Sequence, residues 1–266
     1  THELSAEGLG QVVEIAKEFG IRKVKITGGE PLLRQDIIEI ISTIAQSGMK
    51  DVSLTTNGTL LSDFAGSLVD AGLKRINVSI DTLREDTYRK ITRTSMLKQV
   101  KEGVDAAVNV GLSPVKLNMV LLRGINEDEI DNMIEFARSR GAVLQLIELL
   151  CTPRTQEVYQ KFHVDLSSIE KELEKRAQRI DVRREMQARK KYFIDGAEVE
   201  IVRPMHNSQF CANCTRMRLT SDGYLKPCLL RNDNLVNISK ALQTGEIENV
   251  KNLFLKAVSL REPFFK

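Results

Sequence analysis

Apolar positions along the first 150 residues alternate between two periods, one typical of strands and the other of helices. The short apolar runs predict five strands, at 22–27, 51–55, 75–80, 115–121 and 142–149. Longer stretches with apolar residues every three or four positions predict helices at about 5–20, 36–47, 62–71, 97–110 and 127–140. Strands that alternate with helices of this length indicate βα units and a parallel sheet.

Each predicted strand follows a helix, so we expect one further strand ahead of residue 1. With that strand, six βα units would form a partial (βα)6 barrel of the TIM-like kind, which is an α/β fold. Ligands of such barrels bind at the carboxyl ends of the strands. We therefore predict a barrel core over residues 1–150 that lacks its first strand.

The pattern changes after residue 150, where the βα alternation gives way to charged and antiparallel segments. A charged helix is predicted at 166–179, and the basic segment 183–191 is expected to be a solvated face. Turn residues predict two hairpins, one around Asp195-Gly196 and one around Ser221-Asp222-Gly223. Residues 151–266 are therefore expected to form a small α+β extension.

Composition and charge narrow the class of protein. Hydrophobic residues make up 42% and charged residues 28%, which is ordinary for a globular domain. No apolar run approaches the about 18 residues of a membrane span, and no signal peptide opens the chain. A cytoplasmic protein without a membrane partner is therefore expected. With 5% aromatic residues, no Trp and a net charge of +3, a small anionic ligand is favoured over nucleic acid.

Three of the four cysteines have the spacing Cys211-x2-Cys214-x13-Cys228. A tight turn and a returning hairpin would let these thiolates converge on one metal centre, either zinc or an iron–sulfur cluster. Zinc would need a fourth ligand, for which His206 is the candidate, whereas a three-cysteine cluster keeps one iron open. The spacing leaves both interpretations open. Cys151 is isolated and is expected to be a packed thiol.

A glycine pair and two lysines mark the ends and the interior of the predicted strands. The segment Gly28-Gly29-Glu30-Pro31 follows the first strand, where it would either admit a ligand close to the backbone or form an ordinary turn. Lys25 and Lys116 lie on apolar strands, where an unpaired charge is costly. They predict either an anionic ligand such as phosphate or internal salt bridges with Glu30 or Glu148.

Two arginines follow the cysteine pair directly. Arg216 and Arg218 are two positions apart on a predicted strand, so both point to one face. Paired guanidinium groups suit phosphate oxygens, and the alternative is a solvated hairpin face.

These motifs together resemble one family. The run Lys25-Ile-Thr-Gly-Gly-Glu-Pro-Leu-Leu-Arg34 resembles the motif by which radical S-adenosylmethionine (SAM) enzymes bind the amino group of SAM. The run Cys211-Ala-Asn-Cys-Thr-Arg-Met-Arg-Leu-Thr-Ser-Asp-Gly-Tyr-Leu-Lys-Pro-Cys228 is similar to the C-terminal cluster motif of the family of molybdenum cofactor biosynthesis protein A, the GTP 3′,8-cyclases. Segments 55–58, 77–81 and 116–118 fall in the order of that family, so the resemblance covers the whole chain.

The resemblance implies a six-stranded partial barrel closed by the C-terminal extension, and it assigns site residues. Contact with SAM is implied for Gly29, Glu30, Ser79, Asn118 and Leu150. Contact with GTP is implied for Lys25, Thr56, Lys116, Arg216, Met217 and Arg218, with Arg216 and Arg218 as catalytic residues. Cys211, Cys214 and Cys228 would hold a [4Fe–4S] cluster whose open iron ligates guanine, which favours iron–sulfur over zinc.

The implied reaction is the first step of molybdenum cofactor (molybdopterin) biosynthesis, catalysed by a lyase. A 5′-deoxyadenosyl radical made from SAM removes hydrogen from C3′ of GTP, and the sugar radical attacks C8. The product is (8S)-3′,8-cyclo-7,8-dihydroguanosine 5′-triphosphate. The implied partners are GTP, SAM, an external electron donor and the next pathway enzyme, which makes the cyclic pterin; a homodimer is compatible with the sequence.

Two departures from the family pattern qualify this assignment. The Cys-x3-Cys-x2-Cys run that holds the radical-generating cluster is not in these 266 residues. We therefore expect a second [4Fe–4S] cluster only with a further N-terminal segment, and no activity without it. Lys25 stands where many relatives carry Arg. The alternatives are a non-catalytic nucleotide-binding metal protein and another radical SAM enzyme with an auxiliary cluster.

Overall fold

One mixed sheet of eight strands organises the computed structural model, which describes residues 3–183 and 187–265. Its strand order is β1-β2-β3-β4-β5-β8-β7-β6. The five strands expected in the first 150 residues are present, consecutive and parallel: β1 (Lys23–Ile26), β2 (Asp51–Thr56), β3 (Arg75–Ser79), β4 (Val115–Val120) and β5 (Val143–Ile147). The predicted parallel α/β sheet is confirmed.

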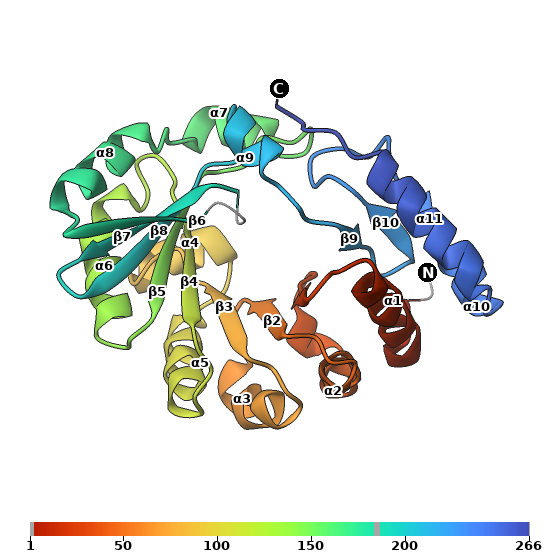
Figure 1. The fold of residues 1–266 in the computed structure, drawn as a ribbon. Helices are drawn as coiled ribbons and strands as arrows, with labels where there is room; N and C mark the ends of the chain where they lie inside the picture. Colours follow the sequence, from red (N-terminus) through yellow and green to blue (C-terminus); the bar gives the residue numbers. More distant parts are fainter. Residues whose placement is uncertain (1–2, 184–186, 266) are drawn as a thin grey trace.

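Helices cover the outer side of this curved sheet (Figure 1). They are α1 (Ala6–Glu18), α2 (Ile37–Gln46), α3 (Leu61–Asp70), α4 (Glu85–Thr92), α5 (Leu97–Asn109) and α6 (Ile130–Arg138), with the short 3-10 helices η1 (Pro31–Leu33) and η2 (Glu127–Glu129). Ile41, Leu68 and Val104 of the helices are buried against Leu54 and Leu117 of the strands in one continuous core. The arrangement fits a TIM-like partial barrel. Helix α4 was not predicted, because it buries only Thr87 and Tyr88 and most of its other side chains are charged.

A sixth parallel strand lies beyond residue 150, where the sequence suggested a separate extension. Strand β8 (Ala197–Val202) pairs in parallel with β5, with Gln145 opposite Glu200. Strands β7 (Arg189–Ile194) and β6 (Arg179–Arg183) then continue the same sheet antiparallel. The hairpin around Asp195-Gly196 is confirmed. A boundary at residue 150 stays a prediction, but the sheet continues across it.

Three expectations for this part of the chain need correction. The charged helix, α8 (Ser167–Arg176), ends before residue 179, because residues 179–183 pair with β7 as strand β6. A further helix, α7 (Gln156–Phe162), precedes it; it has no buried residue, so the sequence carried no apolar period. The basic segment 183–191 is not wholly a solvated face, because Arg189 is 8% exposed. Residues 184–186 of that segment lie outside the described residues.

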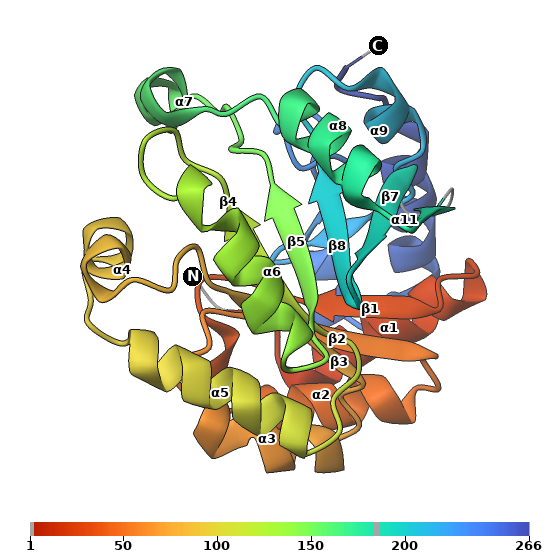
Figure 2. The same cartoon turned by 90° about the vertical axis from the view of Figure 1, so that its left-hand side faces the viewer.

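The C-terminal part forms a second layer that returns to α1. It comprises α9 (Ser208–Ala212), a small sheet of β9 (Arg218–Leu219), β10 (Tyr224–Lys226) and β11 (Val236–Asn237), and then α10 (Ser239–Gln243) and α11 (Ile247–Ser259). The second predicted hairpin is confirmed by the antiparallel pairing of β9 and β10. Figures 1 and 2 show α11 close to α1, where Phe254 stacks on Phe19 at 5.1 Å and a second core forms.

Within residues 3–183 and 187–265, no helix combines the length and the apolar character that crossing a bilayer requires.

Candidate active site

A chain of polar side chains crosses the inner face of the parallel sheet. Lys25 Nζ donates to Asn77 Oδ1 at 2.9 Å, and Asn77 Nδ2 donates to Gln145 Oε1 at 2.9 Å and to Asn118 Oδ1 at 3.1 Å. Gln145 Nε2 in turn donates to Glu200 Oε2. The residues come from β1, β3, β4, β5 and β8, so parallel pairing of adjacent strands brings together groups that lie far apart in sequence.

Glu200 is the centre of charge in this network. Its side chain is 0% exposed, and its Oε1 lies 2.6 Å from Lys116 Nζ and 3.1 Å from Arg183 Nη1. Arg189 Nη1 lies 3.7 Å from the other carboxylate oxygen, Oε2, and Lys191 Nζ lies 3.9 Å from Oε1. Burial opposes ionisation, but Lys116 and the arginines outweigh it and lower the pKa of Glu200 to about 2. The salt-bridge partner of Lys116 is therefore Glu200, and not the predicted Glu30 or Glu148.

Lys25 faces an excess of positive charge. In the described part of the chain its side chain forms no salt bridge, and its hydrogen bond goes to neutral Asn77. Lys25 is accessible to solvent, but the protein around it and repulsion by Arg75, Arg216 and Lys116 lower its pKa to about 7. A cationic group that other cations crowd favours an anionic ligand.

Arg216 and Arg218 approach this face from the segment after α9. Burial lowers the pKa of both guanidinium groups, and Arg216 repels both Lys25 and Arg218. The Nη1 atom of Arg218 is buried and has no hydrogen-bond partner among the described residues. Because a buried donor normally has a partner, this atom points to an acceptor that is external to the chain. Met217, between the two, packs instead against the second core.

The three cysteines of the predicted cluster lie near these arginines, each half-buried and free. Cys214 N–H donates to the Cys211 carbonyl at 3.2 Å, which confirms the tight turn. Burial disfavours the Cys214 thiolate, but the Arg216 N–H and the Arg261 guanidinium outweigh it and lower the pKa of the thiol. Cys214 and Cys228 both act on the charge of Arg218, so both lie near it.

The fit of a metal centre to these thiols is partial. Thiolates are the form that ligates iron, and the cationic surroundings favour them. Across residues 3–183 and 187–265, however, no three His, Cys, Asp or Glu side chains are gathered closely enough to hold a metal ion. His206, the candidate fourth zinc ligand, instead lies against the Phe265 ring at 5.0 Å. The three-cysteine site therefore stays a prediction.

The glycine loop after β1 leaves open space beside its backbone. A Cβ atom built on Gly28 or Gly29 meets nothing within 4 Å, and neither residue has a positive φ. The fold itself therefore does not require glycine at these positions. The Glu30 carboxylate accepts hydrogen bonds from Thr56 Oγ1 and Asn57 N–H at 2.6 Å each. Thr56, which is 2% exposed, therefore holds Glu30 in place.

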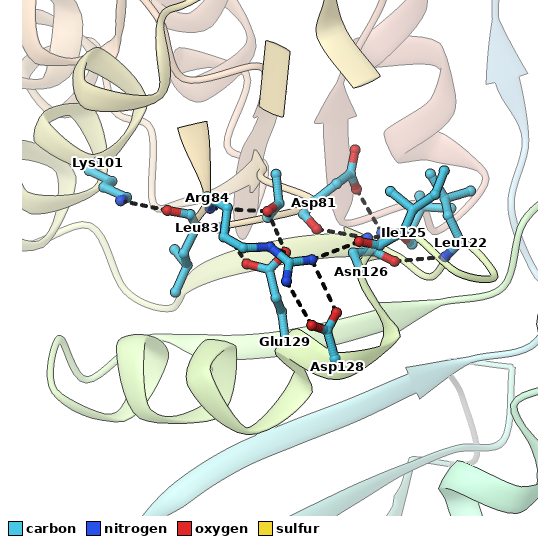
Figure 3. Close-up of polar contacts among 11 residues, drawn as sticks. Asp81, Leu83, Arg84, Lys101, Leu122, Ile125, Asn126, Asp128 and Glu129 are labelled. Carbon is cyan, nitrogen blue, oxygen red and sulfur yellow. Dashed lines mark hydrogen bonds and ion pairs between the residues drawn. The ribbon is translucent and has the colours of Figure 1, made fainter. Parts of the chain in front are cut away.

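The predicted SAM residues Ser79 and Asn118 lie on β3 and β4. The loops that follow these two strands are tied together by hydrogen bonds (Figure 3). Asn126 Nδ2 donates to the carbonyls of Asp81 and Val120 at 2.7 and 2.9 Å, and Asp81 Oδ1 accepts from Val120 N–H at 2.7 Å. Burial raises the pKa of Asp81 to about 6 despite that last hydrogen bond. These contacts make a fixed rim at the carboxyl ends of the strands. Leu150, the last predicted SAM residue, is half-buried beyond β5.

Sequence analysis missed several residues of the inner face, namely Arg75, Asn77, Gln145, Arg189 and Glu200. The signal for Glu200 was its place between Val199 and Ile201, which makes it a charge in an apolar strand like Lys25 and Lys116. Its strand was read as one arm of a hairpin in the C-terminal extension, and the charge was assigned no role.

Two family models match the chain. The radical SAM superfamily model matches residues 1–137, and the Molybdenum Cofactor Synthesis C model matches residues 142–266. A probable GTP 3′,8-cyclase from Methanothermobacter marburgensis is 52% identical over 265 residues, which cover 99% of this chain and 87% of that protein. The probable GTP 3′,8-cyclase of Methanocaldococcus jannaschii is 46% identical over 263 residues, with coverages of 99% and 86%.

Solved structures show likeness in fold alone. SuiB from Streptococcus suis bound to S-adenosylmethionine superposes with a TM-score of 0.67 at 16% identity, over 93% of this chain and 59% of that chain. This chain thus spans about three fifths of the length of SuiB. Native anSMEcpe with bound AdoMet superposes with a TM-score of 0.59 at 15% identity, over 97% and 75%.

Proposed function

The chain belongs to the radical SAM superfamily and, within it, to the GTP 3′,8-cyclase family, and from this premise we propose that it cyclises GTP. The reaction joins C3′ of the ribose to C8 of guanine and is the first step of molybdenum cofactor synthesis. The observation that carries the proposal is the cationic inner face of the sheet, where Lys25 lies among Lys116, Arg75 and Arg216 and forms no salt bridge within the described residues. That charge excess suits a triphosphate.

The residues of this chain bind and orient the nucleotide. Lys25 and Lys116 on the strands and Arg216 and Arg218 opposite them offer ammonium and guanidinium groups to the phosphate oxygens. The buried, unpartnered Nη1 of Arg218 supports a direct contact. Met217 would contribute through its backbone, because its side chain packs on the second core. Thr56 supports the site indirectly, because its Oγ1 donates a hydrogen bond to the Glu30 carboxylate.

The glycine loop is proposed to receive SAM. The open space beside Gly28 and Gly29 lets the cofactor approach the backbone, and the tethered Glu30 fixes the course of the loop. Ser79, Asn118 and Leu150 would complete the cofactor site on the rim that Figure 3 shows.

We assign Cys211, Cys214 and Cys228 to a [4Fe–4S] cluster from their spacing, and the cationic surroundings of Cys214 favour its thiolate. When bound, SAM and the iron–sulfur clusters supply the radical chemistry, and the protein binds, orients and shields the substrate. A second cluster needs a Cys-x3-Cys-x2-Cys run, which these 266 residues do not contain. We propose a cytoplasmic location, an external electron donor, and a following enzyme that makes the cyclic pterin.

Two measurements test the assignment. After anaerobic reconstitution, about four irons and four sulfides per chain are expected, whereas one zinc without sulfide would refute the cluster.

GTP binding is then measured by calorimetry in the parent chain, in Arg218→Gln and in the control Arg89→Gln. Arg89 is exposed and pairs only with Asp86 among the salt bridges of the described residues. Loss of a charge-assisted contact in Arg218→Gln should weaken binding by at least about tenfold, and the control should bind as the parent does.

Turnover separates the enzyme from a non-catalytic binder. The cyclised nucleotide is sought by mass spectrometry in protein that also carries a Cys-x3-Cys-x2-Cys segment, with SAM and a reductant. GTP binding without any product in that protein would favour the binder, and no GTP binding in any form would refute the proposal.

A further inference from the structure

Glu200 is a full negative charge inside a site that suits an anionic substrate. It is 0% exposed and contacts Lys116 at 2.6 Å and Arg183 at 3.1 Å. A buried carboxylate would repel phosphate, so its presence calls for a compensating role. Neither the nucleotide contacts nor the cofactor contacts proposed above include it.

Lys116 depends on this carboxylate. The Lys116 side chain is 5% exposed, and Glu200 is its salt-bridge partner. Burial lowers the pKa of Lys116 to about 8, with Arg183 and Arg189 lowering it and Glu200 raising it. Without Glu200 the ammonium would face burial and repulsion alone, and its protonated form would be lost near neutral pH.

Glu200 also sets the direction of the amide chain. Because a carboxylate only accepts, Gln145 must present its Nε2 to Glu200 and its Oε1 to Asn77. Asn77 then turns its Nδ2 towards Gln145 and its Oδ1 towards Lys25. Because Glu200 accepts a hydrogen bond at one end of the network, Asn77 Oδ1 is left to accept from the Lys25 ammonium at the other end.

We propose that Glu200 is a positioning residue, which holds Lys116 and the Gln145–Asn77 amide chain in the orientation that receives the phosphates of the substrate. This inference rests on the proposed function. The charged groups that act on Lys116 are Lys25 of β1, Arg183 of β6, Arg189 of β7 and Glu200 of β8. Next to these groups lie Arg75 of β3, Lys191 of β7 and Arg216. Two further acidic residues lie at the edge of this charged group: Asp51 pairs with Arg75, and Glu198 pairs with Lys191.

The first test is GTP affinity of Glu200→Gln by calorimetry between pH 6 and pH 8. If Glu200 keeps Lys116 charged, the loss of affinity grows with pH and reaches at least about fivefold at pH 8, because a fall in the pKa of Lys116 from about 8 to about 7 lowers its protonated fraction there from about one half to about one tenth. Glu198→Gln is the matched control, since Glu198 lies on the same strand and face but pairs with Lys191. Glu198→Gln should keep the parent profile. If Glu200→Gln binds GTP more tightly at every pH, Glu200 only repels the substrate and the proposal is wrong.

A second test needs no ligand. The lysine 15Nζ and 13Cε signals are titrated by NMR, with Lys116→Arg to assign Lys116. Glu200→Gln should lower the pKa of Lys116 by about one unit or more, and an unchanged value would overturn the proposal. Because this readout is independent of GTP, it stands even if the chain proves not to bind the nucleotide.

A double variant covers the case in which Glu200→Gln fails to fold. Lys116→Met with Glu200→Gln removes both charges of the pair, and removal of both partners is better tolerated than removal of one. With Lys116 already removed, Glu200→Gln can act only through the Gln145–Asn77 chain, so it should weaken GTP binding less in the Lys116→Met background than in the parent chain. An equal or larger loss in the Lys116→Met background would contradict the proposed route.

Discussion

We predict that the charge of Lys25 makes GTP binding depend on pH near neutrality. The loss of water around Lys25 to the surrounding protein, followed by repulsion from Arg75, Arg216 and Lys116, lowers the pKa of Lys25 to about 7. A lysine with a lowered pKa is fully charged below that value and loses its charge as the pH rises through it. The protonated fraction therefore falls from about 90% at pH 6 to about 10% at pH 8. If only the protonated form of Lys25 contacts the phosphates, the affinity for GTP falls about tenfold over the same pH range.

Lys25→Arg isolates this effect, because a guanidinium stays charged throughout this range. The γ-phosphate of GTP also titrates, with a pKa of about 6, but this titration affects binding to both proteins equally. The quantity to follow is therefore the ratio of the two dissociation constants, measured by calorimetry from pH 6 to pH 8. Measurements in buffers of different ionisation enthalpy should also show that the parent chain takes up a proton on binding at pH 8.

The expected ratio changes about tenfold across this range in favour of Lys25→Arg. A constant ratio would mean either that Lys25 remains protonated to pH 8 or that it does not contact the phosphates, and either result would refute the reasoning.

Three glycine substitutions, one of them a control, test the packing and the cofactor loop. In Gly103→Ala the new methyl group would lie 2.6 Å from the Gly58 carbonyl oxygen, so we expect a loss of about 1–3 kcal/mol in the free energy of unfolding. Gly66→Ala, an exposed site in α3 with nothing within 4 Å, should instead gain about 0.5–1 kcal/mol in denaturant titration; equal effects would contradict the packing argument. Gly29→Ala should leave unfolding unchanged and weaken SAM binding at least about tenfold, because its methyl group fills the space left for the cofactor. Unchanged SAM affinity in a folded Gly29→Ala protein would show that the cofactor does not approach the loop there.

The sequence predicted most of the parallel sheet because each strand is a compact apolar run between turn residues. Its five strands from 22 to 149 correspond to β1 to β5, and Ser5 caps α1 by accepting from Gly8 N–H at 3.2 Å. Both hairpins were predicted from their turns. Local signals failed where burial was slight, as in α4 and α7, and where a charged segment became a strand, as in β6.

The candidate site was predicted as a set of residue types and not as a set of contacts. Lys25 and Lys116 could be singled out because a charge in an apolar strand needs a partner. The partner itself was not predictable. Glu200 lies 84 positions from Lys116, and it reaches Lys116 only because β8 pairs with β5.

The sequence by itself determined the five parallel strands and most of the helices of the first 150 residues, which side chains share a face, and which motifs carry the family chemistry. Tertiary structure alone decided that β8 adds to the parallel strands, that Arg189 is buried on the inner face, and that Glu200 neutralises part of the charge around Lys116. The physical reason is that side-chain alternation depends on neighbours along the chain. Strand order depends instead on which distant surfaces bury the most apolar area together.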